Sequence, residues 1–327
     1  MKFNRVNVLL IKICLFAVLL SSITSCARYK TGELLTKGDN GGKFYTNEEI
    51  EAVVAFRDKF RIKNNLPLPT DIPRTEIGIF IMNGLLYVPV TVNGKKGNMV
   101  LDSGASGISL SIETFESLGG TYNVDDSAYF YFPREIDLGF GKIAYTANYS
   151  GMFNRNGMGY VGSSIYGFYA ERVTFDYKNR KLILNDEVPN VEPISCDVST
   201  GHIVTEGKVN GVPVKICLDT GAPTGLINNE IFNFPLTDML TEDVNWEYFN
   251  STMLTGNSYY YDVELVEIGN ITLTKTFTGL VVQDSATDMY ADVLSSINVD
   301  MLLGYDFFAR NRITVDYKNG LLWLESY

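Results

Sequence analysis

The pattern of hydrophobic and polar residues from Ile77 to the C-terminus is that of β-strands. Short alternating or β-branched apolar runs follow one another, and Gly and Asn turn signals separate them. The clearest runs are Tyr87–Val92, Val173–Phe175, Leu182–Leu184, Val263–Ile268 and Leu321–Leu324. Twenty Tyr and 19 Phe also favour strands. We therefore expect an all-β fold for this part of the chain.

A helical pattern precedes the strands. Thr46-Asn47-Glu48-Glu49 has the form of a capping box, and apolar residues follow it at helical spacing as far as Ile62. Pro67 and Pro69 lie beyond this run, where a helix cannot continue. The pattern predicts a short N-terminal helix over residues 47–63, packed outside the main fold. The polar, Gly-rich stretch 27–45 suits a flexible tether.

The strand-forming part contains an internal repeat. Asn93-Gly94 and Asn210-Gly211 are turn signals 117 residues apart, and each Gly is followed eight residues later by Asp-(Ser/Thr)-Gly-Ala. Further along, residues 172–179 (RVTFDYKN) and 312–319 (RITVDYKN) agree at six of eight positions, at an offset of 140. The two halves thus share the same order of motifs.

Two copies of one β unit pack naturally about a pseudo-two-fold axis. We therefore expect two homologous β lobes with a cleft between them, residues 71–190 and residues 191–327. A single chain would then supply both halves of the site, so we expect a monomer.

Each copy carries one carboxylate at the end of an apolar strand, Asp102 and Asp219. An isolated ionised carboxylate is costly to bury, so the position requires an explanation. If the copies face each other, the two like charges cannot both ionise, and the pair shares one proton. One member can then act as a base towards water while the other polarises a carbonyl. The alternative is a pair of turn aspartates that only cap backbone amides. The residues that would support the pair are Ser103, Gly104, Thr220 and Gly221.

The chain has few residues that could form a metal site or a nucleophilic catalytic triad. His202 is the only histidine, so a zinc site or a Ser-His-Asp arrangement has too few members. We expect His202 to lie on a strand at the start of the second lobe, and we expect no metal and no cofactor. Asp176 and Asp316 also repeat, but their Asp-Tyr-Lys-Asn turns indicate a structural role. Cys196 and Cys217 are more consistent with free thiols than with a disulfide, since Cys217 lies in an apolar strand.

The paired Asp-(Ser/Thr)-Gly-Ala motifs resemble the aspartic peptidases of the pepsin and retropepsin clan. The downstream hydrophobic-hydrophobic-Gly segment of that clan is matched well by Leu302-Leu303-Gly304 and more loosely by Tyr160-Val161-Gly162. The resemblance covers residues 76–327. It implies two β-barrel lobes, an Asp102/Asp219 dyad that activates water for peptide hydrolysis, and Ser103 and Thr220 bonding across the lobe interface. A flap has no clear match in the first repeat; in the second, Thr255-Gly256-Asn257 is either a flap tip or an ordinary hairpin.

The N-terminus predicts a targeting segment. Lys2 and Arg5 precede a mostly apolar run that is short for a spanning helix, and Ile23-Thr24-Ser25-Cys26 then resembles a bacterial lipobox. We expect residues 1–25 to be a signal peptide and Cys26 to carry the lipid, with ordinary secretion as the alternative. The chain would then be anchored in the bacterial cell envelope, in the outer membrane if Ala27 directs sorting.

The charge balance excludes one class of partner. The chain has 27 Lys and Arg against 38 Asp and Glu, a net charge of −11, which repels phosphate backbones. We therefore expect no nucleic-acid binding. The expected partner is an extended polypeptide that is cleaved. Two other functions remain open: a degenerate peptidase that only binds peptides, and an envelope scaffold that uses its acidic surface.

Overall fold

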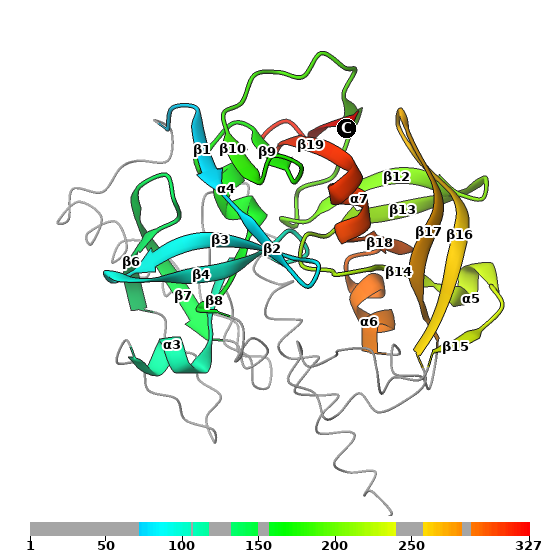
Figure 1. Cartoon of the computed structure of the whole chain (residues 1–327), viewed down its shortest axis with the longest axis horizontal. Helices are drawn as coiled ribbons and strands as arrows, with labels where there is room; N and C mark the ends of the chain where they lie inside the picture. The colour runs from blue at the N-terminus through cyan, green and yellow to red at the C-terminus, as the bar shows by residue number, and fades with distance from the viewer. Residues whose placement is uncertain (1–71, 106, 118–131, 150–156, 240–257, 283–288) are drawn as a thin grey trace, which may run out of the picture.

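The computed structural model describes residues 72–105, 107–117, 132–149, 157–239, 258–282 and 289–327 (Figure 1). These residues are mostly β-strands with a few short helices, so the all-β prediction is confirmed for them. The expected signal peptide (1–25) with Cys26, the expected tether (27–45), the helix expected over 47–63 and the candidate flap tip at 255–257 lie outside the described residues.

The first half forms a closed sheet. Strand β3 pairs with β6 as well as with its other neighbours, which closes the sheet into a barrel. Helices α3 (Ile112–Ser117) and α4 (Ser163–Tyr169) flank its strands. The strand order is β2 (Phe80–Met82), β3 (Leu85–Val92), β4 (Lys95–Asp102), β8 (Gly159–Gly162), β5 (Ile108–Leu110), β7 (Lys142–Tyr149) and β6 (Phe132–Asp137).

The second half forms another closed sheet, on the right in Figure 1, where β12 pairs with β16 to complete the circuit. Its helices are α5 (Asn229–Phe232), α6 (Met289–Ser296) and α7 (Tyr305–Arg310). The strand order is β12 (Ile203–Val209), β13 (Val212–Leu218), β18 (Met301–Leu303), β14 (Gly225–Asn228), β17 (Ile271–Val281), β16 (Ser258–Ile268) and β15 (Thr237–Met239).

The two closed sheets have the same topology. The order β3-β4-β8-β5-β7-β6 corresponds to β12-β13-β18-β14-β17-β16, and β2 and β15 are additions at the edges. The parallel pairs fall at equivalent places, β4 with β8 and β13 with β18. The turns that open the repeat also agree, because Asn93 and Asn210 both have positive φ before a positive-φ Gly. This is the geometry of a tight Asn-Gly hairpin. The sequence repeat is thus a structural repeat.

A third, six-stranded sheet joins the halves. Its central pair is β9 with β19, where Thr174 lies opposite Thr314 and their Oγ1 atoms are 2.9 Å apart. These two residues are equivalent in the repeat, so the pseudo-two-fold axis passes between them. The strand order is β1 (Thr75–Gly78), β10 (Lys181–Leu184), β9 (Val173–Asp176), β19 (Asn311–Asp316), β20 (Leu321–Ser326) and β11 (Ile194–Ser195).

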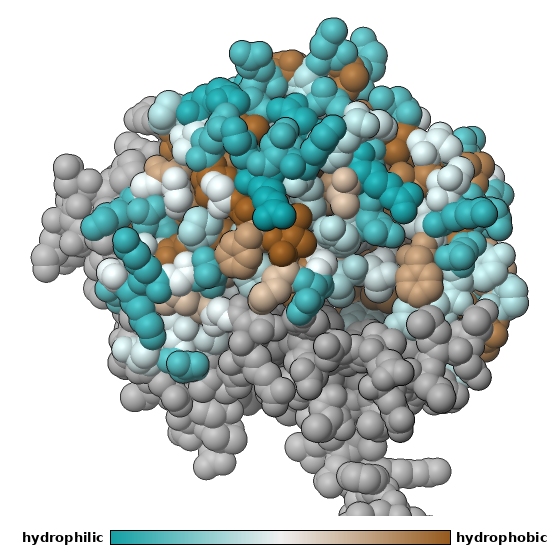
Figure 2. All heavy atoms as spheres, viewed as in Figure 1, coloured by the Kyte–Doolittle hydropathy of each residue, from teal (hydrophilic) through white to brown (hydrophobic). Residues whose placement is uncertain are grey.

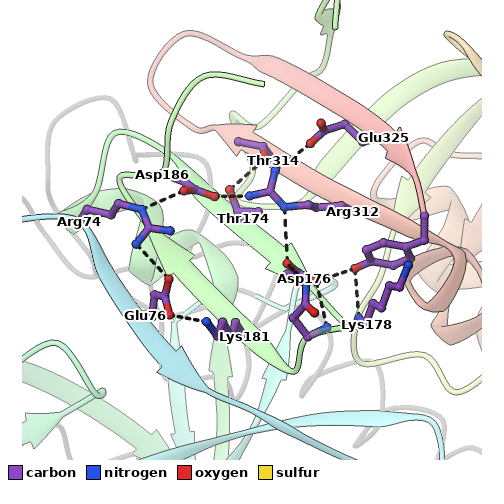
Figure 3. Close-up of polar contacts among 12 residues, drawn as sticks. Arg74, Glu76, Thr174, Asp176, Lys178, Lys181, Asp186, Arg312, Thr314 and Glu325 are labelled. Carbon is purple, nitrogen blue, oxygen red and sulfur yellow. Dashed lines mark hydrogen bonds and ion pairs between the residues drawn. The ribbon is translucent and has the colours of Figure 1, made fainter. Parts of the chain in front are cut away.

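An ionic network fastens this third sheet (Figure 3). The carboxylate of Asp186, only 4% exposed, binds both Arg312 and the Nε of Arg74, the latter at 3.0 Å. Arg312 also binds Glu325 at 2.8 Å. A buried carboxylate is retained only where it is paired, and here its two partners come from different halves. Asp186 therefore links the start of strand β1, through Arg74, to the C-terminal β19–β20 hairpin, through Arg312.

The hydrophobic core runs through both closed sheets and the third sheet without interruption. Phe175 on β9 meets Phe308 on α7 edge to face, with ring centroids 5.6 Å apart. At the surface, hydrophilic side chains gather over the third sheet, whereas hydrophobic ones reach the surface near the middle of the same face (Figure 2). The continuous core means that the two halves do not pack as independent bodies.

Candidate active site

Two equivalent strands deliver Asp102 and Asp219 to the junction of the halves. Asp102 is the last residue of β4, after the buried Met99, Val100 and Leu101, and Asp219 follows β13. Each strand lies beside the parallel strand of the hydrophobic-hydrophobic-Gly segment, β8 or β18. The looser Tyr160-Val161-Gly162 match thus occupies the same structural place as Leu302-Leu303-Gly304. As whole residues, Asp102 and Asp219 are both of intermediate exposure.

Ser103 and Thr220 lock the two loops together across the axis. The backbone N–H of Ser103 donates to Thr220 Oγ1 at 2.9 Å, and the N–H of Thr220 donates to Ser103 Oγ at 2.8 Å. Each hydroxyl in turn donates to a carbonyl of the opposite half, Ser103 to Leu218 at 2.7 Å and Thr220 to Leu101 at 2.6 Å. Both side chains are 0% exposed, so each partner left unsatisfied would cost about 1–3 kcal/mol.

The two glycines allow the loops to approach each other. A Cβ added to Gly104 would lie 2.5 Å from Cγ of Asp219, and a Cβ added to Gly221 would lie 2.4 Å from Cγ of Asp102. Real Cβ atoms do not approach carboxyl groups this closely. Each carboxyl therefore rests on the glycine of the opposite half, and the two carboxyl groups are within hydrogen-bonding reach of each other.

The two carboxyls accept different numbers of hydrogen bonds from backbone amides. The N–H of Gly104 donates to Asp102 Oδ1 at 2.9 Å and also to Asp219 Oδ1 at 3.1 Å. The N–H of Gly221 donates only to Asp219 Oδ1, at 2.8 Å. Asp219 thus receives two amide hydrogen bonds and Asp102 receives one. Hydrogen bonds to a carboxylate favour its ionised form.

The pKa values of the two carboxyls differ in the direction that these hydrogen bonds favour. Burial raises the pKa of Asp102 well above its usual range, and the negative charge of Asp219 raises it further. Burial also raises the pKa of Asp219, but the amides of Gly221 and Gly104 and the carboxyl of Asp102 oppose that rise. The two carboxyls therefore titrate as one coupled pair, in which burial and the neighbouring charge disfavour ionisation of Asp102 more than that of Asp219.

His202 is the site residue that sequence reasoning missed. We expected His202 to lie on a strand, but it lies immediately before β12. The residue is 1% exposed. Its Nε2 is 3.0 Å from the carbonyl oxygen of Gly104, and its Nδ1 is 3.0 Å from Oγ1 of Thr200. Because a carbonyl only accepts, Nε2 carries the proton and donates it to Gly104. Burial lowers the pKa of His202 to about 4, so the ring is neutral above that pH.

The other residues singled out in the sequence have structural surroundings. The carboxylates of Asp176 and Asp316 accept hydrogen bonds from the backbone and side chain of Asn179 and Asn319, respectively, as the structural interpretation predicted. Cys196 and Cys217 are free thiols, which confirms that prediction. Burial raises the pKa of Cys217 well above its usual range and that of Cys196 to about 12, so neither is a reactive thiolate.

Within the described ranges, no three His, Cys, Asp or Glu side chains come together as metal ligands would. No helix in the same part of the chain is long and apolar enough to cross a bilayer.

Comparison with known proteins agrees with this geometry. A family model described as aspartyl protease matches residues 88–128, a short part of the chain that contains Asp102, Ser103 and Gly104. The match supports an aspartic-peptidase-like family. No curated protein matches the chain at a significant level.

Proposed function

We propose that this protein is an aspartic endopeptidase of two lobes, with Asp102 and Asp219 as its catalytic dyad. The observation that carries the proposal is that two carboxyls from equivalent positions of a repeat meet at the junction of the halves. The unequal amide hydrogen bonds then divide the roles. Turn aspartates that only cap amides have no reason to face each other across an axis.

The reaction needs a base and an acid side by side at the scissile peptide, and the two neighbouring carboxyls can supply both. The Asp219 carboxylate takes a proton from water as the water oxygen bonds to the peptide carbonyl carbon. Asp102 gives its proton to the carbonyl oxygen, which yields a neutral tetrahedral diol. The proton then held by Asp219 passes to the leaving nitrogen as the C–N bond breaks, and a diol hydroxyl returns its proton to Asp102. The pair ends as it began, and no covalent intermediate forms.

The substrate class is part of the proposal. A single chain contributes both carboxyls, so a monomer suffices. Partial exposure of the dyad lets a backbone carbonyl approach it, and we assign an extended polypeptide as the substrate. The acidic surface disfavours nucleic acid as a partner. No residue of the proposed mechanism calls for a metal or a cofactor.

Incubation with a mixed peptide library should give cleavage that a statine-type transition-state mimic blocks. The rate should follow a bell-shaped pH profile, because the active pair carries one proton. Activity falls at low pH, where Asp219 becomes protonated and the base is lost. It falls again as pH rises through the raised pKa of Asp102, where the acid is lost. Peptide binding without cleavage at every pH would instead support the inactive, peptide-binding alternative.

We propose separately that Cys26 is lipidated after removal of residues 1–25, which anchors the protein in the bacterial cell envelope. This rests on the basic, apolar and Ile-Thr-Ser-Cys segments of the N-terminus. In a bacterial host, Cys26→Ser should move the protein from the membrane fraction to the soluble fraction. If the variant remains with the membranes, the lipid anchor is wrong. The peptidase proposal does not depend on this result.

A further inference from the structure

The strand pairs β3–β4 and β12–β13 correspond at an offset of 117 residues, and this identifies the counterpart of His202. In the first half Tyr87 pairs with Val100, and in the second half Val204 pairs with Cys217. Both members of the pair shift by the same offset, so the strands are in equivalent register. The residue equivalent to His202 is therefore Leu85.

These two equivalent residues have different contacts. Leu85 is 4% exposed and belongs to an apolar cluster with Tyr87, Val100 and Tyr160. His202 is buried too, but its imidazole reaches from the second half into the first and donates to the carbonyl of Gly104. Leucine has no donor, so the symmetric contact with Gly221 cannot form. Among the residues described, no hydrogen bond to the Gly221 carbonyl is found.

The same glycine makes the asymmetric contact with the dyad. Gly104 and Gly221 each donate to the carboxyl of their own half, at 2.9 Å and 2.8 Å. Only Gly104 also donates across the axis, at 3.1 Å to Asp219. The hydrogen bond across the axis thus comes from Gly104, whose carbonyl accepts from His202. Gly221, whose carbonyl has no such partner among the described residues, makes no bond of this kind. The carbonyl and the N–H of Gly104 belong to the two peptide planes that meet at its Cα, so holding the carbonyl restrains the loop at that Cα and limits the directions in which the N–H can point.

We propose that His202 is a positioning residue that holds Gly104 so that its N–H reaches Asp219, and that it thereby selects Asp219 as the carboxylate of the pair. The consequence for catalysis rests on the proposed function, but the effect on the protonation of the pair does not. The hydrogen bonds found for His202 go to Thr200 and Gly104, and neither goes to a carboxyl of the pair. It acts through one backbone carbonyl.

Four ionisable groups other than the two aspartates bear on a titration of the pair. Burial raises the pKa of Cys217, Tyr177 and Tyr290, so these three remain neutral in the acidic range. His202 itself gains a proton only near its lowered pKa of about 4. Its protonated ring still donates from Nε2, and Thr200 can accept from Nδ1. A glutamine at this position carries a donor without a charge, which separates the hydrogen bond from the titration.

The test compares three substitutions at one position. His202→Leu copies the first half, His202→Gln places an amide N–H near the position of Nε2, and His202→Asn places one near Nδ1. The carboxyl carbons of the aspartates are followed by NMR in protein labelled with ¹³C-aspartate, from pH 2 to pH 8. Losing an amide hydrogen bond to a carboxylate should raise the lower pKa of the pair by about one unit in the Leu and Asn variants. The Gln variant should titrate close to the wild type.

Peptide hydrolysis gives the second readout. The Leu and Asn variants should lose about tenfold in kcat with little change in KM, and the Gln variant should recover most of the loss. Near-ultraviolet circular dichroism measures the folded fraction of each variant. If the Leu variant fails to fold, the comparison of the Asn variant with the wild type tests the role of His202. A lower pKa that does not move in folded Leu or Asn variants overturns the inference. If the wild type cleaves no peptide, the proposed function fails, while the titration still decides the role of His202.

Discussion

Asp219→Asn abolishes peptide hydrolysis while the protein stays folded: this is the largest effect we expect. The Asn side-chain oxygen can still accept the N–H bonds of Gly104 and Gly221. It cannot take a proton from water at any pH of interest, so the base is lost. General acid–base catalysis by one such group contributes about 1,000-fold, and kcat/KM should fall by at least that much. The fold is checked by thermal melting and circular dichroism.

The matched control is Asp316→Asn. Asp316 is likewise a repeated, buried aspartate, 3% exposed, but its carboxylate only caps the turn at Lys318 and Asn319. The control should lower the melting temperature and keep the specific activity. If Asp219→Asn retains hydrolysis, or if both variants lose it equally, Asp219 is not the base and the proposed mechanism is wrong.

The sequence predicted that the two carboxyls lie close together, because the same aspartate motif occurs at equivalent positions of the two copies. One offset relates Asn93-Gly94 to Asn210-Gly211 and also Asp102 to Asp219. A duplicated β unit packs about an axis, so motifs at equivalent positions face each other. The Ser103–Thr220 contacts and the Thr174–Thr314 contact obey the same rule, at offsets of 117 and 140 residues. Symmetry thus made long-range contacts predictable from local motifs.

Features that break the symmetry were not predictable in this way. His202 has no motif around it, and its partner Gly104 is 98 residues away in sequence. Its only signal is that a histidine stands where the first half has Leu85, and that is informative only once the strand register is known. The third sheet was missed for a different reason. Its edge strands β1 and β11 lie outside the motifs that the two copies share.

The proposed division of roles between Asp102 and Asp219 also required the structure. The two Asp-(Ser/Thr)-Gly motifs are nearly identical, so nothing in the sequence distinguishes the acid from the base. The distinction arises from one amide, because Gly104 reaches both carboxyls and Gly221 reaches one. A hydrogen bond of this kind depends on a small rotation of one residue, which no sequence pattern records.

The second large effect concerns the space between the loops, and Gly104→Ala is the change that tests it. The backbone of Gly104 has no positive φ, so alanine is compatible with its conformation. Its new methyl group would nevertheless lie 2.5 Å from Asp219 Oδ2, too close for any neighbour to accommodate without moving. The carboxyl of Asp219 must shift, and misplacement of a catalytic group by about 1 Å can cost about 100-fold in rate. We expect kcat/KM to fall by about that factor, and Gly221→Ala should do the same through Asp102.

The control for this steric argument is Gly78→Ala on β1. Gly78 also lacks a positive φ, and a Cβ added there meets no atom within 4 Å. Activity and melting temperature should both stay near the wild-type values. Since the two substitutions add the same methyl group to compatible backbones, any difference between them measures what lies opposite the glycine. A Gly104→Ala variant as active as Gly78→Ala would mean that the loops stand further apart, and carboxyls so separated could not share a proton.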